Sequence, residues 1–251
     1  MTALRSALFA VLALLFTAVM MAVMLPGLAL PRKRFQRLAA CWCGGLLVLL
    51  RVCCGLRWRL TGAENLPRGP AIIAAKHQSA WDTLIFHVLL DDPVYVLKRE
   101  LVRIPLFGWY LSKGGSIAID RRAGLRAIRT MLPAVDCALA EGAQVIVFPE
   151  GTRTAPGEHA PYHPGIAALY NQADAPIVPV ALNSGLFWGR RHLRKRPGVI
   201  TIEVLPAMPA GLSRSAFLAE LEQRVETATA RLSAQPIAPT RSTLTISTPE
   251  Q

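Results

Sequence analysis

The chain has 251 residues, which is enough for one domain of ordinary size with additional segments. Hydrophobic residues make up 52% of it and the mean hydropathy is +0.35, so we expect a membrane-contacting part beside a soluble one. The net charge of +12 suits anionic lipid, acidic substrates or nucleic acid, but aromatic residues are only 7% and no zinc-finger spacing, RNP-like run or recognition helix accompanies the charge. A membrane surface is therefore favoured over nucleic acid.

Residues 7–30 form an uncharged apolar run that is long enough to cross a hydrocarbon core of about 30 Å. Arg5 precedes this run, as in a signal peptide, but the run is longer than a usual signal-peptide core and no A-x-A cleavage site follows. We therefore expect a retained membrane anchor.

A second apolar run, residues 38–56, is interrupted by Arg51 and is borderline as a membrane span. The basic cluster at 32–37 is expected on the cytoplasmic side of the membrane, because positive charge favours that side. A second helix that re-enters the bilayer or lies at its surface would keep the remaining chain on the same side. The sequence thus predicts membrane-anchoring helices over residues 1–58, followed by a cytoplasmic domain.

Short β-branched runs alternate with longer runs of helical periodicity over residues 59–234. We expect strands at 71–75, 94–97, 116–119, 144–148, 177–182 and 199–205. We expect helices at 82–90, 123–141, 164–173 and 213–233. Strands separated by helices indicate an α/β fold, with a mixed, largely parallel central sheet flanked by helices. Residues 235–251 are rich in Ser, Thr and Pro and are expected to be a disordered tail.

Polar clusters follow three of the expected strands: KHQSAWD after 71–75, DRR after 116–119 and PEGTR after 144–148. Ligands of open α/β sheets bind beyond the carboxyl ends of the strands. We therefore expect an active site assembled from these three clusters.

His77 and Asp82 in the first cluster are candidates for acid–base chemistry. If His77 lies in a loop and Asp82 in the first turn of a helix, the chain can fold back so that the carboxylate orients the imidazole as a base. The alternative is a solvated loop histidine with Asp82 as a helix cap. A metal site that includes His87 matches no standard spacing, and Ser79 lacks the G-x-S-x-G context of a nucleophile.

The other two clusters contain candidate phosphate ligands. Gly151 permits close approach of the backbone to a ligand, and Arg153 can bind a phosphate through two donors. Arg121 is a second candidate phosphate ligand. An ordinary turn with a surface Glu–Arg pair is the alternative for the cluster that contains Gly151.

Two further segments are rich in basic residues. Residues 98–115 mix Lys and Arg with Leu, Ile, Phe, Trp and Tyr, which is typical of the lipid headgroup region, or of a packed helix with charged flanks. Residues 190–196 predict either a lipid-facing patch or a basic loop. Pro179 interrupts the strand at 177–182, where we expect a structural wall beside the site.

The blocks KHQSAWD, GSIAIDR, VFPEGTR and IVPVALN, in this order and spacing, resemble those of the 1-acylglycerol-3-phosphate acyltransferase family. The resemblance covers roughly residues 60–205, and the apolar N-terminus fits the bacterial members. It implies that His77 is the general base and that Asp82 orients it. It also implies binding of the glycerol phosphate by the residues that match the family's remaining blocks: Arg121, Glu150, Gly151, Thr152 and Arg153.

The implied reaction transfers a fatty acyl group from acyl-CoA or acyl carrier protein to the sn-2 hydroxyl of lysophosphatidic acid, giving phosphatidic acid without an acyl-enzyme. No metal or cofactor is expected, and the implied partners are membrane lipids, lysophosphatidic acid and the acyl donor, not nucleic acid. The implied location is the inner membrane, with the catalytic domain facing the cytoplasm. Two alternatives remain: acylation of another lyso-lipid, such as a lyso-ornithine lipid or lysophospholipid, and a non-catalytic basic protein of membrane surfaces or nucleic acid.

Two residues depart from the family pattern. Lys76 stands where asparagine commonly precedes the histidine, so a contact made by that amide is replaced or lost. His163 stands where a lysine is frequent, which puts a phosphate contact at that position in doubt.

Overall fold

The computed structural model describes residues 2–190 and 192–235. The helices are α1 (Thr2–Gly27), α2 (Arg32–Cys54), α3 (Asp82–Leu89), α4 (Phe107–Lys113), α5 (Leu125–Ala140), α6 (Pro164–Gln172) and α7 (Arg214–Ala234). The strands are β1 (Leu56–Thr61), β2 (Ala71–Ala75), β3 (Pro93–Lys98), β4 (Ile117–Ile119), β5 (Gln144–Val147), β6 (Ile177–Leu182) and β7 (Gly198–Val204). Four short 3₁₀ turns connect them: η1 (Ala63–Asn65), η2 (Arg99–Arg103), η3 (Arg121–Ala123) and η4 (Ser184–Leu186).

The strands form one seven-stranded sheet in the order β1-β7-β6-β2-β5-β3-β4. All neighbouring pairs are parallel except β6 and β7, which are antiparallel. The predicted α/β fold, with a mixed and largely parallel sheet, is therefore confirmed. The expected strands and helices of residues 71–234 all occur, with ends shifted by a few residues.

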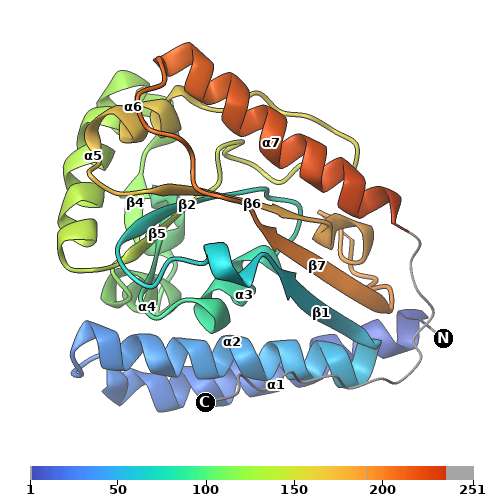
Figure 1. Cartoon of the computed structure of the whole chain (residues 1–251). Helices are drawn as coiled ribbons and strands as arrows, with labels where there is room; N and C mark the ends of the chain where they lie inside the picture. Colours follow the sequence, from blue (N-terminus) through green and yellow to red (C-terminus); the bar gives the residue numbers. More distant parts are fainter. Residues whose placement is uncertain (1, 191, 236–251) are drawn as a thin grey trace, which may run out of the picture.

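Helices cover both faces of the sheet, with α2 and α3 on one side and α5, α6 and α7 on the other (Figure 1). Side chains alternate along a strand, so Ile73 of β2 packs toward α2 and α3 while Ile72 packs toward α5 and α7. Burial on both faces explains why the central strands have nearly continuous apolar sequences.

Strand β1 was not among the predicted strands. Its sequence LRWRLT carries two arginines, and most of its side chains are partly or fully exposed. It pairs in parallel with β7 at the edge of the sheet, where a polar strand is tolerated. Because β1 begins at Leu56, it crosses the predicted boundary between residues 58 and 59.

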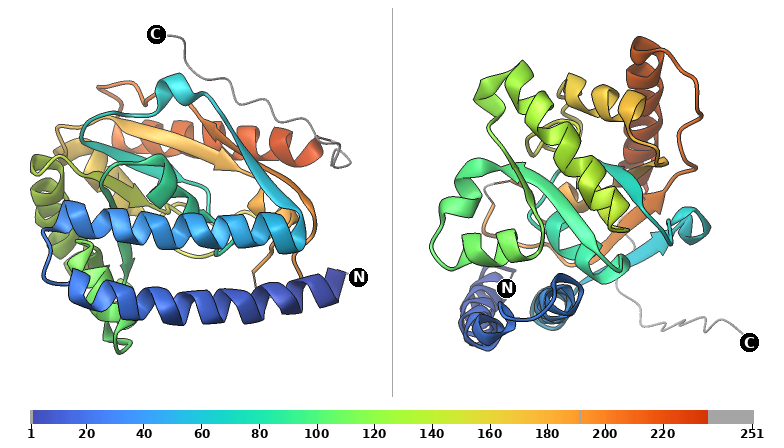
Figure 2. Two further views of the ribbon diagram at one scale, coloured as in Figure 1. Left: turned by 90° about the horizontal axis from the view of Figure 1, so that it is seen from below. Right: turned by 90° about the vertical axis from the view of Figure 1, so that its left-hand side faces the viewer.

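Helices α1 and α2 lie side by side and antiparallel along the α/β domain (Figure 2). Both are long and apolar enough to cross a membrane by length and composition. Helix α2 also belongs to the core, since Cys43, Leu46 and Leu50 are buried against the sheet side that carries α3. Its first residue, Arg32, forms ion pairs with Asp92 at 2.8 Å and with Glu141 at 3.0 Å, so the start of the helix is attached to the domain.

Helix α1 packs mainly on α2 and exposes most of its apolar side chains. The segment 98–115 forms η2 and α4, and it exposes Leu101, Ile104, Leu106 and Trp109. The Tyr110 hydroxyl donates a hydrogen bond of 2.6 Å to the carbonyl oxygen of Met21, which places α4 beside α1. The two apolar surfaces are thus neighbours. The predicted tail at 235–251 lies, apart from Gln235, outside the described residues.

Candidate active site

His77 and Asp82 meet at the carboxyl end of β2. His77 lies in the loop after this strand, and Asp82 is the first residue of α3. The His77 Nδ1 and Asp82 Oδ2 atoms are 3.0 Å apart. The sequence-based arrangement of a loop histidine that pairs with a carboxylate in the first helical turn is therefore found in the structure.

The Asp82 carboxylate is fully buried and is fixed by other donors besides the imidazole. The backbone N–H groups of Gln78 and Ser79 donate to Oδ2 at 2.7 and 2.8 Å, and the Ser184 hydroxyl donates to Oδ1 at 2.5 Å. A buried carboxylate needs such donors to remain charged. Sequence reasoning missed Ser184, although its position just after β6 placed it at the same edge of the sheet as the other clusters.

The His77 imidazole stacks on the ring of Phe148, with centroids 3.9 Å apart and an interplanar angle of 15°. With Nδ1 facing Asp82, the Nε2 atom has no hydrogen-bond partner among the residues that the structure describes. The side chain of His77 lines a cavity of about 460 Å³. This combination leaves one nitrogen available to accept a proton from a ligand in the cavity.

Arg121 and Gly151 converge at this cavity from two different strand ends. Gly151 has a φ of +63°, and a Cβ atom there would lie 2.6 Å from the His163 ring and 3.3 Å from Nη1 of Arg121. Only glycine fits this backbone conformation and this close approach without displacing a neighbour. The glycine thus leaves room for the Arg121 and His163 side chains, both of which lie close to its backbone.

Three arginines line the cavity: Arg121, Arg153 and Arg190. Burial lowers the pKa of Arg121 below its ordinary value, while the charge of Glu100 raises it. No carboxylate forms an ion pair with Arg121 or Arg153 within residues 2–190 and 192–235. The neighbouring Asp120 binds the Arg99 side chain at 2.7 Å instead. The arginines are therefore available to an anionic ligand.

Thr152 lines the same cavity, but Glu150 does not. Its side chain is fully buried behind the cavity wall, and its two oxygens accept hydrogen bonds from Lys76, Thr154 and the His77 backbone. In place of the substrate contact expected from the sequence, Glu150 holds parts of the protein together.

The basic segment at 190–196 divides into two environments. Arg190 lines the cavity and donates to the carbonyl oxygen of Arg153 at 3.0 Å. Lys195 is buried, with its ammonium group 4.9 Å from the ring centre of Phe9 and 4.8 Å from that of Trp188. Arg190 and the other described residues of this segment are exposed, and Lys195 is the buried one. Arg191 lies outside the described residues.

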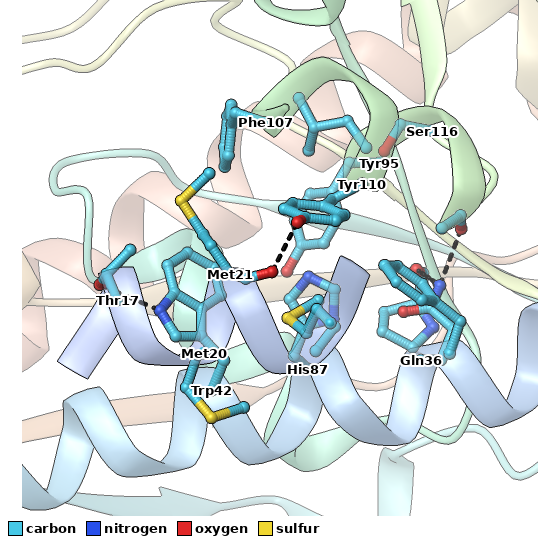
Figure 3. A pocket seen from close by; sticks show the side chains of 16 residues that line it. Thr17, Met20, Met21, Gln36, Trp42, His87, Tyr95, Phe107, Tyr110 and Ser116 are labelled. Carbon is cyan, nitrogen blue, oxygen red and sulfur yellow. Dashed lines mark hydrogen bonds between the residues drawn. The ribbon is translucent and has the colours of Figure 1, made fainter. Parts of the chain in front are cut away.

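The cavity becomes apolar away from the arginines, toward α1, α2 and α4. Trp42, Tyr95 and Phe107 line both the main cavity and a smaller one of about 70 Å³. Figure 3 shows Met20 and Met21 of α1 with Trp42 of α2 around this smaller cavity. A polar end with three arginines and an apolar end with aromatic and methionine side chains suit an amphiphilic ligand.

A third cavity, of about 360 Å³, opens on the other side of the sheet edge, between β4, β5, α5 and α6. Its lining is mostly apolar, and it shares Arg121, Phe148 and Gly151 with the main cavity. His163, which departs from the family pattern, lines this cavity and not the main one.

The chain matches proteins of known family over the region that holds this site. A family model described as Acyltransferase matches residues 57–183. The chain is 38% identical over 195 residues to the 1-acyl-sn-glycerol-3-phosphate acyltransferase of Pseudomonas aeruginosa, which covers 78% of this chain and 76% of that protein. It is 33% identical over 167 residues to the human 1-acyl-sn-glycerol-3-phosphate acyltransferase alpha, covering 65% of this chain and 59% of the human protein.

The fold is similar to that of a solved structure described as the 1-acyl-sn-glycerophosphate (LPA) acyltransferase, PlsC, from Thermotoga maritima. The TM-score is 0.76 at 20% sequence identity, and the match covers 94% of this chain and 99% of the other. These similarities confirm the resemblance seen in the sequence blocks. The chain therefore belongs to the acyltransferase family, among the bacterial relatives of the 1-acyl-sn-glycerol-3-phosphate acyltransferases.

Proposed function

We propose that the protein transfers a fatty acyl group from an acyl thioester to the sn-2 hydroxyl of lysophosphatidic acid, giving phosphatidic acid. The observation that carries this proposal is that one cavity is lined by His77, which is paired with Asp82, and by three arginines, and also has an apolar end. This cavity offers a base for the hydroxyl, cations for the phosphate and an apolar wall for an acyl chain. The family relationship supports the same substrate class.

The neutral His77 imidazole takes the proton of the acceptor hydroxyl at Nε2 while the hydroxyl oxygen attacks the thioester carbonyl. The carbon–sulfur bond then breaks, and the imidazolium returns the proton to the departing thiolate. Asp82 stabilises the transient imidazolium and holds the ring orientation. No acyl-enzyme forms, because a thioester is reactive enough for direct attack once both substrates are positioned.

The phosphate of the acceptor binds at the polar end of the cavity, to Arg121 and Arg153, with Arg190 beside them. Guanidinium groups bind phosphate oxygens through paired donors, and burial of Arg121 strengthens the attraction. Glu150 acts behind the wall and Gly151 shapes it. In this proposal the reaction requires no metal ion or cofactor, since the histidine base and the arginine side chains supply the chemistry.

The exposed apolar surfaces of α1, η2 and α4 support our proposal that the protein binds the membrane that supplies the acceptor. In our proposal this is the inner membrane, with the α/β domain in the cytoplasm, where acyl-CoA and acyl carrier protein are found. The two-helix segment serves as the anchor, and α2 connects it to the sheet.

The direct test uses the purified protein in detergent with lysophosphatidic acid and either acyl-CoA or acyl carrier protein as donor. Mass spectrometry of the products is expected to show phosphatidic acid. Lyso-ornithine lipid and lysophospholipids with larger head groups, tested as alternative acceptors, are expected to react more slowly. His77→Ala is expected to abolish transfer while the protein still binds vesicles. Transfer that persists in this variant would contradict the base assignment, and preference for another lyso-lipid would contradict the acceptor.

A further inference from the structure

Lys76 directly precedes the catalytic histidine, and its side chain is only 1% exposed. Its ammonium nitrogen lies 2.6 Å from Glu150 and 2.7 Å from Glu226, a residue of α7. We call Lys76, Glu150 and Glu226 the buried ion cluster. A buried lysine is rare unless it is paired, and Lys76 forms ion pairs with two carboxylates.

The buried ion cluster is joined to the catalytic loop through Glu150. One oxygen of Glu150 binds the Lys76 ammonium group, and the other accepts a hydrogen bond of 3.0 Å from the backbone N–H of His77. The Thr154 hydroxyl donates to Glu150 at 2.7 Å, and the Thr154 backbone N–H donates to the His77 carbonyl oxygen at 2.9 Å. Both backbone polar groups of His77 are thus held by the segment that follows β5.

Helix α7 completes the connection from the other side. Tyr162 donates a hydrogen bond of 3.1 Å to Glu226, and the exposed His159 lies 3.2 Å from the same carboxylate. Burial raises the pKa of Tyr162 far above its ordinary value, and the neighbouring carboxylates raise it further, so the phenol stays a neutral donor. Glu226 therefore has partners that keep its carboxylate directed at Lys76.

Lys76 does not line any of the cavities described here, and its donors are directed to carboxylates. It is therefore placed to act on the geometry of the site and not on the substrate. The cluster contains one positive and two negative groups, so removal of the lysine would leave the buried Glu150 carboxylate beside the partly buried carboxylate of Glu226. Repulsion between like charges in a poorly solvated site is costly.

We propose that Lys76 and Glu226 are positioning residues that hold the His77 backbone, through Glu150, in the geometry in which Nδ1 meets Asp82. Glu226 is the partner that lets a lysine stand where relatives of this family commonly carry asparagine. The C-terminal helix α7 is by this means coupled to the catalytic loop. The expected effect on turnover rests on the proposed acyltransferase function, but the effect on His77 geometry does not.

The test compares Glu226→Gln, Lys76→Asn and the double variant Lys76→Asn/Glu226→Gln in the full-length protein. Glu226→Gln keeps the Lys76–Glu150 pair and is expected to lower kcat by less than about 3-fold. Lys76→Asn removes the ammonium group that both carboxylates bind and is expected to lower kcat by about 10-fold to 100-fold, with KM for lysophosphatidic acid within about 2-fold. The double variant is expected to recover at least about 5-fold of that loss, because one of the opposing charges is gone.

A spectroscopic measurement reports the His77 geometry without any turnover. An imidazole N–H that is hydrogen-bonded to a carboxylate gives a downfield proton resonance, which is assigned to His77 by its absence in His77→Asn. We expect this resonance in the wild-type protein and in Glu226→Gln, its loss or broadening in Lys76→Asn, and its return in the double variant. Lys195→Asn is the control, since it removes another buried lysine, which packs on Phe9 and Trp188 and does not line the main cavity, and it is expected to keep both the resonance and kcat.

A cluster that only stabilised the fold would give a different pattern. Lys76→Asn would then melt at a lower temperature but keep its resonance and its kcat per folded molecule, and this result would overturn the proposal. Failure of Glu226→Gln to improve Lys76→Asn would overturn it as well. If Lys76→Asn alone does not fold, Glu226→Ala takes its place, and an unchanged resonance and kcat in that variant count against the proposal. A resonance that follows the expected pattern in a protein inactive on lysophosphatidic acid would refute the proposed function and leave the positioning role intact.

Discussion

The Ser184 hydroxyl group donates a hydrogen bond of 2.5 Å to Oδ1 of Asp82, although the two residues lie 102 positions apart in the sequence. The bond joins the end of β6 to the start of α3, across the edge of the sheet where the His77 loop lies. It fixes the carboxylate that pairs with His77, so the position of the imidazole depends on two separate strand ends.

Ser184→Ala is therefore expected to lower kcat by about 10-fold and to cost about 1–2 kcal/mol of unfolding free energy, since a hydrogen bond to a charged group is lost. Steady-state kinetics and urea unfolding in detergent measure the two effects. Ser213→Ala is the matched control, because Ser213 caps α7 through the Ala216 N–H and should affect stability alone. Equal kcat values for Ser184→Ala and the wild type would contradict a role for this bond in orienting Asp82.

Gly151→Ala is expected to raise KM for lysophosphatidic acid by about 10-fold, because the new methyl group would meet the His163 ring at 2.6 Å and press on Arg121. Gly157→Ala is the control for backbone strain alone: its φ is +83°, but its Cβ would enter open space. Both variants should lose comparable stability, and only the first should change KM. A similar KM in the two variants would show that the close approach at Gly151 does not shape the phosphate site.

Arg153→Ala is expected to raise KM about 10-fold for lysophosphatidic acid but to change it little for monoacylglycerol, an acceptor without the phosphate. The reason is that Arg153 lines the polar end of the cavity and has no carboxylate partner among the described residues. Arg122→Ala is the control, since Arg122 is an exposed arginine of η3 that does not line the cavity. An unchanged KM for Arg153→Ala would argue against phosphate binding at this position.

His87 is expected to make the protein sensitive to acid. Burial against the apolar cavity lowers its pKa from 6.5 to about 4, and its Nδ1 atom has no partner among the described residues. Between these two pH values the unfolded chain binds a proton that the folded protein does not, so the free energy of unfolding falls as the pH falls. The expected loss from this residue between pH 7 and pH 4.5 is about 2 kcal/mol.

His87→Phe removes this titration and should reduce the pH-dependent loss of stability by that amount, as measured by unfolding at the two pH values. Phenylalanine suits the site because the His87 ring already packs 5.2 Å from that of Tyr95, at the cavity shown in Figure 3. His192→Asn, at an exposed histidine, is the control for removal of a histidine that is not buried. If His87→Phe lost as much stability in acid as the wild type, acid sensitivity would have to come from other groups.

Much of the geometry of the candidate site follows from short-range patterns. The apolar run at 71–75 ends in a polar loop, and the helical run after it begins at Asp82, so the sequence predicted both the loop position of His77 and the helical position of its partner. Three polar clusters follow strand ends, which predicted that Arg121, Gly151 and Arg153 would lie at the same cavity as His77. The structure confirms this arrangement. These features could be read because each depends on neighbours along the chain.

Other features depend on contacts between residues that are far apart in sequence. Strand β1 is polar and becomes a strand only because β7 offers it a partner, and α2 is both an apolar helix and part of the core. The Glu150 side chain could point to a substrate or inward according to sequence alone. Its direction was decided by Lys76, which follows β2, together with Glu226 of α7.

The sequence by itself therefore determined the α/β class, the positions of six of the seven strands in the described residues, and the histidine and aspartate that pair across a single loop. Only the tertiary structure decided which carboxylates are buried and which cations neutralise them, and it alone joined Ser184 to Asp82. The physical reason is that hydrophobic periodicity acts between neighbours, whereas desolvation and charge pairing depend on whatever the fold brings together.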